Sequence, residues 1–177
     1  MFTDIKNHKT SDHLYPIFNT GYSLACYSGW IESPLDDVDT CYKFVTGQKE
    51  TWSKAQGLCW DIGGRLATLE TEAEIVWIKG YHSHNLILRR LDLWIGGYEK
   101  DGVWYWKGDV TDSPILIIDW GKTQPDDHHG DHGELSGQDR LSLFGDDYRD
   151  PHDWFRFDDN HCDLHKAGFI CEKPVQV

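Results

Sequence analysis

The sequence lacks any long apolar run. The longest uninterrupted ones have four residues each, among them Ile75–Ile78, Val103–Trp106 and Ile115–Ile118. A membrane-spanning helix needs about 20 predominantly apolar residues, so we expect no membrane insertion. The N-terminal residues also include no apolar stretch of the length found in signal peptides. For a secreted protein, this pattern predicts a chain whose signal has been removed.

Positive charge is also scarce. The chain has 17 Lys and Arg against 30 Asp and Glu, so its formal charge is 17 − 30 = −13 with His neutral. Protonation of all 10 histidines would leave the balance negative. Binding to nucleic acid requires Lys and Arg that displace counterions from phosphates, and an acidic surface repels anionic lipids. We therefore expect no nucleic acid partner and no anionic membrane surface as a partner.

Closely spaced cysteine pairs are absent. The five cysteines lie at positions 26, 41, 59, 162 and 171, and no two form a CxxC pair. This arrangement disfavours a zinc knuckle and a thioredoxin-type redox motif. Two disulfides and one remaining thiol, in an oxidising compartment, are the natural interpretation. Spacing alone leaves the pairing open.

Aromatic residues, in contrast, are abundant. The chain contains 9 Trp, 8 Tyr and 7 Phe within 177 residues, and disordered acidic chains characteristically have few aromatics. The length corresponds to a single folded domain with a sizeable core. The following tryptophans are expected in that core: Trp52, Trp94, Trp104, Trp106 and Trp120.

Two helices are predicted near the middle of the chain. Over 51–62, Trp52, Ala55 and Cys59 recur at steps of three and four residues, and two glycines follow. Over 71–81, Thr71 and Glu74 form a capping box.

The remaining regular segments resemble strands. Residues 93–97 and 103–106 are predicted to form a hairpin with a tight turn, 167–172 a closing strand, and 26–44 a short N-terminal hairpin. Beyond Trp120 the sequence shows little periodicity, which predicts a long loop. Helices followed by strands and a long loop indicate an α+β fold, and a long loop in a compact domain is usually functional.

The predicted loop holds most of the excess acid. Between Asp126 and Asp163 there are 12 acidic residues and 3 arginines, a local charge of −9. Asp158 and Asp159 stand among aromatic residues, where unneutralised charge is costly. In Gln124-Pro125-Asp126, a proline is flanked by one side chain with an oxygen donor on each side. Oxygen donors of this kind favour Ca²⁺, which takes 6 to 8 of them. A solvated acidic loop is the simpler alternative.

Taken together, these motifs resemble the long form of the C-type lectin domain. They occur in the expected order over residues 26–174, with residues 1–25 as an N-terminal extension. The matching segments are Cys26 with Gly29-Trp30 and Cys41-Tyr42, Trp52-x-x-Ala55-x-x-x-Cys59 with Gly63-Gly64, Leu93-Trp94-Ile95-Gly96, Trp104-x-Trp106-x-Gly108, Trp120 with Gln124-Pro125-Asp126, and Phe169-Ile170-Cys171-Glu172. The resemblance implies two helices, two small antiparallel sheets and a long Ca²⁺-binding loop. It also implies disulfides Cys26–Cys41 and Cys59–Cys171.

Two departures from the family pattern concern the same region. Arg140 stands where a cysteine would pair with Cys162, so Cys162 is predicted to be free or to link to a second chain in a homo-oligomer. The family's Trp-Asn-Asp motif reads Phe157-Asp158-Asp159, which keeps an aromatic residue and two oxygen donors.

The resemblance also implies a set of site residues. The Ca²⁺ ligands would be Gln124, Asp126, Gln138, Asp158 and Asp159, with Glu134 as an alternative to Gln138. The sugar would contact Gln124, Asp126, Gln138 and Asp158, and would stack on His128, with His129 and His132 as alternatives. A second Ca²⁺ near Glu99, Asp101, Asp127 and Asp139 and a zinc site at His128 and His132 are further alternatives.

The expected function is that of a secreted, Ca²⁺-dependent lectin. The Gln-Pro-Asp order resembles members selective for galactose and N-acetylgalactosamine, so glycans ending in these sugars are the expected partners. The alternative is a C-type lectin-like module that binds a protein or a mineral surface without sugar. No Ser/His/Asp or Cys/His signature accompanies the carboxylates, so we do not expect an enzyme.

Overall fold

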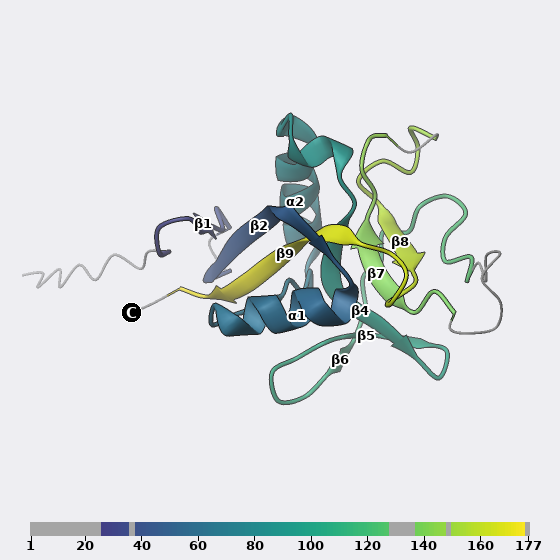
Figure 1. The fold of residues 1–177 in the computed structure, drawn as a ribbon, viewed down its shortest axis with the longest axis horizontal. Coiled ribbons are helices and arrows are strands. Elements are labelled where there is room, and N and C mark those ends of the chain that lie inside the picture. The colour runs from purple at the N-terminus through teal and green to yellow at the C-terminus, as the bar shows by residue number, and fades with distance from the viewer. Residues whose placement is uncertain (1–25, 36–37, 128–136, 148–149, 176–177) are drawn as a thin grey trace, which may run out of the picture.

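The computed structural model describes residues 26–35, 38–127, 137–147 and 150–175 of the chain (Figure 1). The predicted N-terminal extension, 1–25, therefore lies outside the described residues. The helical elements are α1 (Trp52–Asp61), α2 (Glu72–His84) and the short 3₁₀ helix η1 (Leu88–Arg90). The strands are β1 (Ile31–Glu32), β2 (Thr40–Glu50), β3 (Arg65–Leu66), β4 (Leu93–Lys100), β5 (Val103–Trp106), β6 (Ser113–Pro114), β7 (Arg140–Leu143), β8 (Phe157–Asn160) and β9 (Ala167–Pro174).

These strands form one mixed sheet. Its main path runs β1-β2-β9-β4-β5-β6, while β3 pairs with β9 and β7 connects β4 to β8. The pair β4–β9 is parallel, with Leu93 opposite Gly168. The predicted α+β class with two helices is confirmed, but the expectation of two separate antiparallel sheets is corrected. The sheet is continuous because the first five residues of β4, all buried, have neighbouring strands on both edges.

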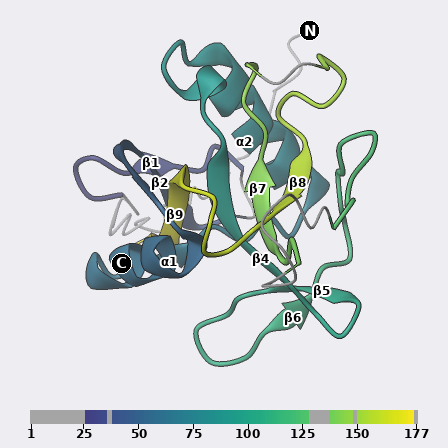
Figure 2. The same cartoon turned by 45° about the vertical axis from the view of Figure 1, so that its right-hand side comes forward.

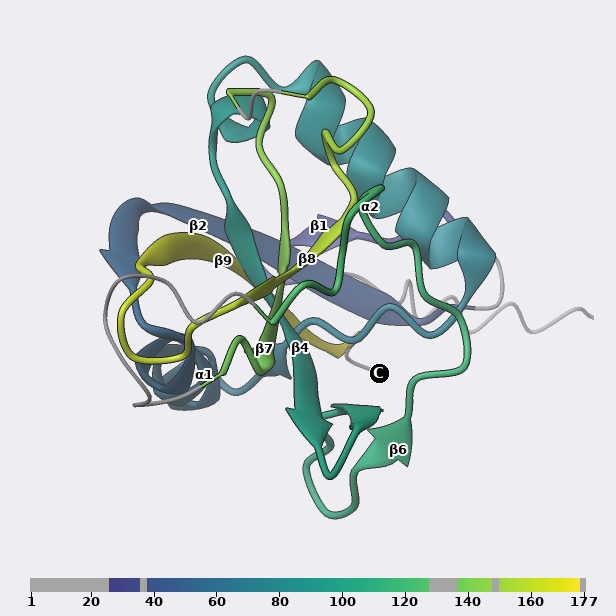
Figure 3. The same ribbon diagram turned by 90° about the vertical axis from the view of Figure 1, so that its right-hand side faces the viewer.

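The two helices pack on opposite faces of this sheet, as Figure 3 shows. Side chains of a strand alternate between faces, so neighbours in β4 enter different cores. Leu93 and Ile95 pack with Ile78 of α2, whereas Trp94 packs with Ala55 of α1. Most of the buried apolar side chains of the described residues thereby belong to two clusters separated by the sheet. The core prediction holds for Trp52, Trp94 and Trp106, which are buried, while Trp104 and Trp120 are half-buried against the first cluster.

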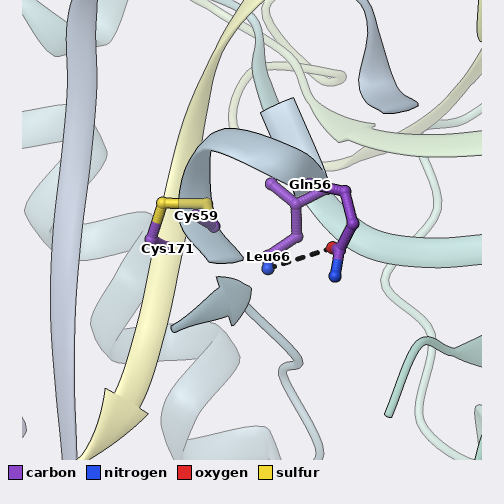
Figure 4. The surroundings of a disulfide bond; sticks show 4 residues. All are labelled: Gln56, Cys59, Leu66 and Cys171. Atoms are coloured by element: carbon purple, nitrogen blue, oxygen red, sulfur yellow. Dashed lines mark hydrogen bonds between the residues drawn. A yellow bond between two sulfur atoms is a disulfide. The ribbon is translucent and has the colours of Figure 1, made fainter. Parts of the chain in front are cut away.

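Helix α1 begins and ends close to the prediction. Thr51 is its N-cap, and the backbone N–H groups of Gly63 and Gly64 donate to carbonyls of the last turn. Gly63 adopts a φ of 76°, a conformation that favours glycine. Figure 4 shows how the helix is attached to the sheet: Cys59 forms a disulfide with Cys171 of β9, and Gln56 accepts a hydrogen bond from the backbone of Leu66.

Helix α2 has the predicted capping box but is longer than expected. The Thr71 hydroxyl accepts from the Glu74 backbone at 3.1 Å, and the Glu74 carboxylate accepts from the Thr71 backbone at 3.0 Å. The apolar period ends at Tyr81, yet the helix continues to His84. The additional turn is packed through a polar side chain, because buried His82 lies 3.0 Å from two backbone carbonyls of the following segment. Sequence periodicity has no signal for such a contact.

The other local predictions can be checked in the same way. Residues 93–97 and 103–106 form the β4–β5 hairpin, and its turn residues Asp101 and Gly102 have φ of 54° and 80°, as a two-residue hairpin turn requires. The N-terminal hairpin is the β1–β2 pair, and the disulfide Cys26–Cys41 closes it. Both disulfides implied by the resemblance are therefore present.

The segment after Trp120 is more regular than predicted. It contains β7 and β8, which pair in register from Arg140–Asn160 to Leu143–Phe157, and β7 lies between β8 and β4 (Figure 2). The sequence of β8, Phe-Asp-Asp-Asn, has neither β-branched residues nor apolar alternation. This strand is determined by its partner β7 and by the burial of Phe157, so local propensity does not reveal it.

Candidate functional site

The candidate site lies where the Gln124-Pro125-Asp126 segment meets strand β8. A bridge between Trp120 and Phe157 and a 2.8 Å bond from the Gly121 N–H to the Phe157 carbonyl hold the preceding residues beside the strand. The Gln124–Pro125 peptide bond is cis. Two segments more than 30 residues apart in the sequence are thus brought together.

Asp159 makes the direct contact between them. One carboxylate oxygen accepts the backbone N–H of Asp126 at 3.0 Å, and the other accepts that of Asp127 at 2.8 Å. The side chain of Asp159 is fully buried, and burial raises its pKa above the ordinary value. The amide hydrogen bonds favour the charged form and limit this rise. Asp126 and Asp159 therefore lie together, while their shared role as Ca²⁺ ligands stays a prediction.

Asp158 points to the opposite face of β8 from Asp159, because successive side chains of a strand alternate. The side-chain amide of Asn160 donates to the Asp158 carboxylate and, at 3.0 Å, to the Ser142 hydroxyl. Burial, followed by the charges of Asp159, Asp92 and Asp126, raises the pKa of Asp158 to about 9. A negative charge is therefore strongly disfavoured at this position unless a cation neutralises it.

Gln124 offers an available acceptor. Its side-chain oxygen Oε1 is buried and has no hydrogen-bond partner among the described residues. A buried amide oxygen without a partner costs about 1–3 kcal/mol, so such groups usually serve a ligand or bind an ordered water or ion.

Gln138 reaches the site through its backbone. Its N–H donates to the Asp127 carboxylate at 2.9 Å, which ties the end of the described loop to the tripeptide. Gly137 lies so close that a Cβ atom there would be 2.4 Å from an Asp127 oxygen. Side-chain ligation by Gln138 remains a prediction.

The residues of the alternative second Ca²⁺ site are partly connected. The Glu99 N–H donates to the Asp139 carbonyl at 2.9 Å, which brings these two residues together. The Glu99 carboxylate, however, accepts the N–H of Gly102 within the hairpin turn, and the Asp139 carboxylate pairs with Arg140 at 2.9 Å. The Glu99 carboxylate is therefore already engaged, whereas the second oxygen of Asp139, Oδ1, is buried without a hydrogen-bond partner among the described residues.

Several expected site residues lie outside the described part of the chain. These are the stacking candidate His128, its alternatives His129 and His132, and the alternative ligand Glu134. Their roles, and the zinc alternative at His128 and His132, stay predictions.

The fit of the site to Ca²⁺ can be judged from its donors. Among the described residues, no group of three or more His, Cys, Asp and Glu side chains is arranged to hold a metal ion. The geometry explains this, since two of the five expected ligands are glutamines and Asp158 and Asp159 point to opposite faces. The buried Gln124 oxygen without a partner and the mutually repelling carboxylates of Asp126, Asp158 and Asp159 nevertheless suit an oxygen-seeking cation. A Ca²⁺ site built from these donors therefore stays a prediction.

Arg140, which stands where the family has the partner of Cys162, packs against aromatic rings. Its guanidinium lies 5.0 Å from the Trp52 ring centre and 5.7 Å from that of Tyr98, within cation–π range. Cys162 carries a free thiol and is buried. A buried sulfur does not reach a second chain without local opening, which argues against the predicted intermolecular link.

Residue types alone did not indicate Asn160 and Ser142 as parts of the site. Both support Asp158 rather than act as expected ligands. The signal that finds Asn160 is the two-residue period of a strand, which places it on the same face as Asp158 once β8 is known.

Comparison with known proteins identifies the family. The family model for the Lectin C-type domain matches residues 48–173. The galactose-specific lectin nattectin of Thalassophryne nattereri is 30% identical over 106 residues, which cover 59% of this chain and 61% of that protein. The type-2 ice-structuring protein of Hemitripterus americanus is 34% identical over 104 residues, which cover 58% of this chain and 55% of that protein. The alignments thus span less than two thirds of either relative.

A solved structure gives the same answer for the fold. The carbohydrate-recognition domain of the mouse scavenger receptor C-type lectin superposes with a TM-score of 0.67 at 28% identity, covering 86% of this chain and 100% of that domain. Ca²⁺ is a common ligand in this family, although some relatives are Ca²⁺-independent. Since the family model covers more than half of its length, the chain belongs to the C-type lectin domain family, whose members are non-enzymatic binding domains.

Proposed function

We propose that this protein is a secreted lectin that binds glycans ending in galactose or N-acetylgalactosamine, with Ca²⁺ as cofactor. The observation that carries the proposal is the contact of Asp159 with the backbone of Asp126 and Asp127. It brings the tripeptide and β8, which the family uses for Ca²⁺ and sugar, into one place. The galactose specificity printed in the name of nattectin supports the choice of sugar.

Five residues would hold the ion. They are Gln124, Asp126, Gln138, Asp158 and Asp159, which together supply three carboxylates and two amide oxygens. When bound, Ca²⁺ would offer coordination positions to two sugar hydroxyls. Gln124, Asp126, Gln138 and Asp158 would also hydrogen-bond these hydroxyls, and His128 would stack on the sugar ring.

The order of amide and acid in the tripeptide supports galactose selectivity. The amide of Gln124 can donate hydrogen bonds, whereas ionised Asp126 only accepts them. Exchanging the two reverses the arrangement of donors and acceptors around the sugar, which favours a different stereochemical pair of hydroxyls.

The direct test is affinity chromatography on galactose-agarose. We expect retention of the disulfide-bonded protein with Ca²⁺ and elution by EDTA or free galactose, with little elution by free mannose. Retention that persists in EDTA, or no retention with Ca²⁺ present, would contradict the proposal.

A matched double variant tests the specificity. Gln124→Glu combined with Asp126→Asn leaves the net charge and the donor count of the site unchanged while reversing their order. We expect Ca²⁺ binding to persist and the preferred eluting sugar to change from galactose to mannose. If galactose remains preferred, the tripeptide does not determine the specificity.

A second function has its own observation in support. Among the described residues, the carboxylates of Asp127, Asp139 and Asp159 are already bound to protein N–H or guanidinium groups. This arrangement, together with the similarity to an ice-structuring protein, favours a module that binds a protein or mineral surface without sugar. No signal on a glycan array, with Ca²⁺ binding still detected by calorimetry, would favour this alternative.

A further inference from the structure

A groove of about 360 Å³ lies at the end of the sheet away from the candidate Ca²⁺ site. Figure 1 shows the C-terminal end of β9 and the end of α1 on one side of the molecule and β7 and β8 on the other. The volume falls within the range of small-molecule pockets. The groove is lined by Thr40, Trp60, Gly63, Gly64, Arg65, Asp109, Glu172, Lys173 and Pro174.

The apolar wall of the groove is an exposed indole beside bare backbone. Trp60, in the last turn of α1, is 62% exposed, although tryptophan is one of the most costly side chains to leave in water. Beside it, Gly63 leaves the backbone bare, because it has no side chain and a Cβ atom there would meet nothing within 4 Å. A flat ligand can therefore lie against the indole and the backbone together.

The polar edge of the groove is fixed in place. Arg65 donates to Glu172 at 2.7 Å and to Asp109 at 3.2 Å. Glu172 also accepts two hydrogen bonds from Thr68, and Lys173 lies 4.1 Å above the ring of Trp30. The contacts with described residues use two of the five N–H donors of Arg65, whose side chain is 30% exposed. Donors and acceptors therefore remain at the groove edge, held by contacts that need no ligand.

Above about pH 7, where Glu172 is ionised, the charges of this edge cancel, because Arg65 and Lys173 are balanced by Asp109 and Glu172. The chain as a whole has a net charge of −13. Such an edge gives no net attraction to an anion or a cation. It suits an uncharged ligand that has one apolar face and a rim of hydroxyl groups.

From this geometry we infer a second, Ca²⁺-independent binding site for an uncharged pyranose unit. The C–H face of the sugar ring stacks on Trp60, and its hydroxyls bond Arg65 and Asp109. The site does not rest on the proposed function, because it shares no residue with the tripeptide or with β8.

The test is saturation-transfer NMR on the intact oxidised protein in EDTA. The probes are the methyl glycosides of galactose, mannose and N-acetylglucosamine. We expect transfer to at least one of them, and a dissociation constant from the titrated signal that is about tenfold weaker in Trp60→Ala, which corresponds to about 1.4 kcal/mol. Leu116→Ala is the matched control, since Leu116 is also apolar and exposed but lies outside the groove. This variant should behave like the wild type.

Two further variants make the outcome decisive. Asp109→Asn removes a charge from a side chain that is 54% exposed, so the fold should tolerate it while sugar transfer falls severalfold. Asp126→Ala should leave the EDTA-resistant signal unchanged, which separates this site from the Ca²⁺ site. Absence of transfer to all three glycosides in the wild type, or equal transfer in Trp60→Ala, would overturn the inference. We expect that a short peptide does not displace the bound glycoside. Full displacement by the peptide would identify a peptide-binding groove and would also overturn the inference.

Discussion

Glu172 is a buried acid, and its ionisation in the folded protein costs free energy. Burial raises its pKa to about 7, even though Arg65 and Thr68 favour the charged form. The folded state therefore holds this proton more tightly than the unfolded chain, in which the ordinary pKa is 4.5. Between these two values the folded state binds more protons, so stability rises as the pH falls toward 4.5 and is lost as the pH rises through 7.

The direction of this pH dependence can be measured with the variant Glu172→Gln. In EDTA, we expect the unfolding free energy of the wild type to fall by up to about 3 kcal/mol more than that of the variant between about pH 5 and about pH 8. Urea unfolding of both proteins at the two pH values gives the difference, and other titrating groups cancel because both proteins share them. An equal pH dependence in the two proteins would show that Glu172 stays ionised throughout.

Cys162 is the cysteine that forms no disulfide. Burial, together with the charge of Asp139, raises the pKa of its thiol, so little thiolate forms at neutral pH. We expect slow labelling by a maleimide in the folded protein, rapid labelling in urea, and no covalent dimer on a non-reducing gel. A dimer band that Cys162→Ser removes would restore the intermolecular link that the burial argues against.

At the scale of single elements, the two helices begin in different ways. Thr71 caps α2 through its hydroxyl and shares a capping box with Glu74. Thr51 holds the same position at α1 but makes no side-chain cap hydrogen bond. The chain thus contains its own control for the contribution of a cap.

We expect Thr71→Ala to lower the unfolding free energy by about 1 kcal/mol, because it leaves an N–H of the first turn without its partner. Thr51→Ala should cost clearly less. Chemical denaturation of the two variants beside the wild type makes the comparison, and equal losses would mean that the cap hydrogen bond contributes nothing measurable.

The elements also show what the sequence can and cannot predict. The start of α2 and the β4–β5 hairpin follow from local signals, namely a capping box and a turn of Asp101 and Gly102. Strand β8 does not, because its acidic sequence forms a strand only through pairing with β7. The end of α2 is missed for a similar reason, since a buried polar contact of His82 extends it.

The candidate site shows the same division. The order of motifs along the chain reflects a shared topology, and the structure brings the backbone of Asp126 to the Asp159 carboxylate. The resemblance does not predict that Asp159 accepts two backbone N–H groups or that Asn160 engages Asp158. Those contacts depend on side-chain orientations that arise only when β8 is folded.

At the scale of the whole molecule, charge is unevenly distributed. Of the net −13, a local −9 lies in the sequence between Asp126 and Asp163, a stretch that includes β7 and β8. The charged groups lining the groove near the end of β9 balance above about pH 7, where Glu172 is ionised. Long-range attraction of cations therefore favours the end with the candidate Ca²⁺ site, while the opposite end suits uncharged ligands. No helix among the described residues is long and apolar enough to cross a membrane.

The two disulfides connect the domain over very different lengths. Cys59–Cys171 links α1 to the last strand across 112 residues, whereas Cys26–Cys41 closes a hairpin across 15. In the chain-entropy model a disulfide that closes a longer loop restricts the unfolded chain more. The resulting stabilisation of the fold is about 4.7 kcal/mol for a loop of 100 residues and about 3 kcal/mol for one of 15. Both sulfurs of the long-range bond are also fully buried in the α1 core, so their loss disturbs packing as well.

We therefore expect Cys59→Ala with Cys171→Ala to destabilise the fold by roughly 1–2 kcal/mol more than Cys26→Ala with Cys41→Ala. Guanidinium unfolding of both double variants in EDTA measures the difference without a contribution from bound Ca²⁺. Cys162 should be replaced by Ser in all three proteins so that no thiol exchange occurs. If the hairpin variant is the less stable one, residues 26–41 contribute to the core more than the loop lengths indicate.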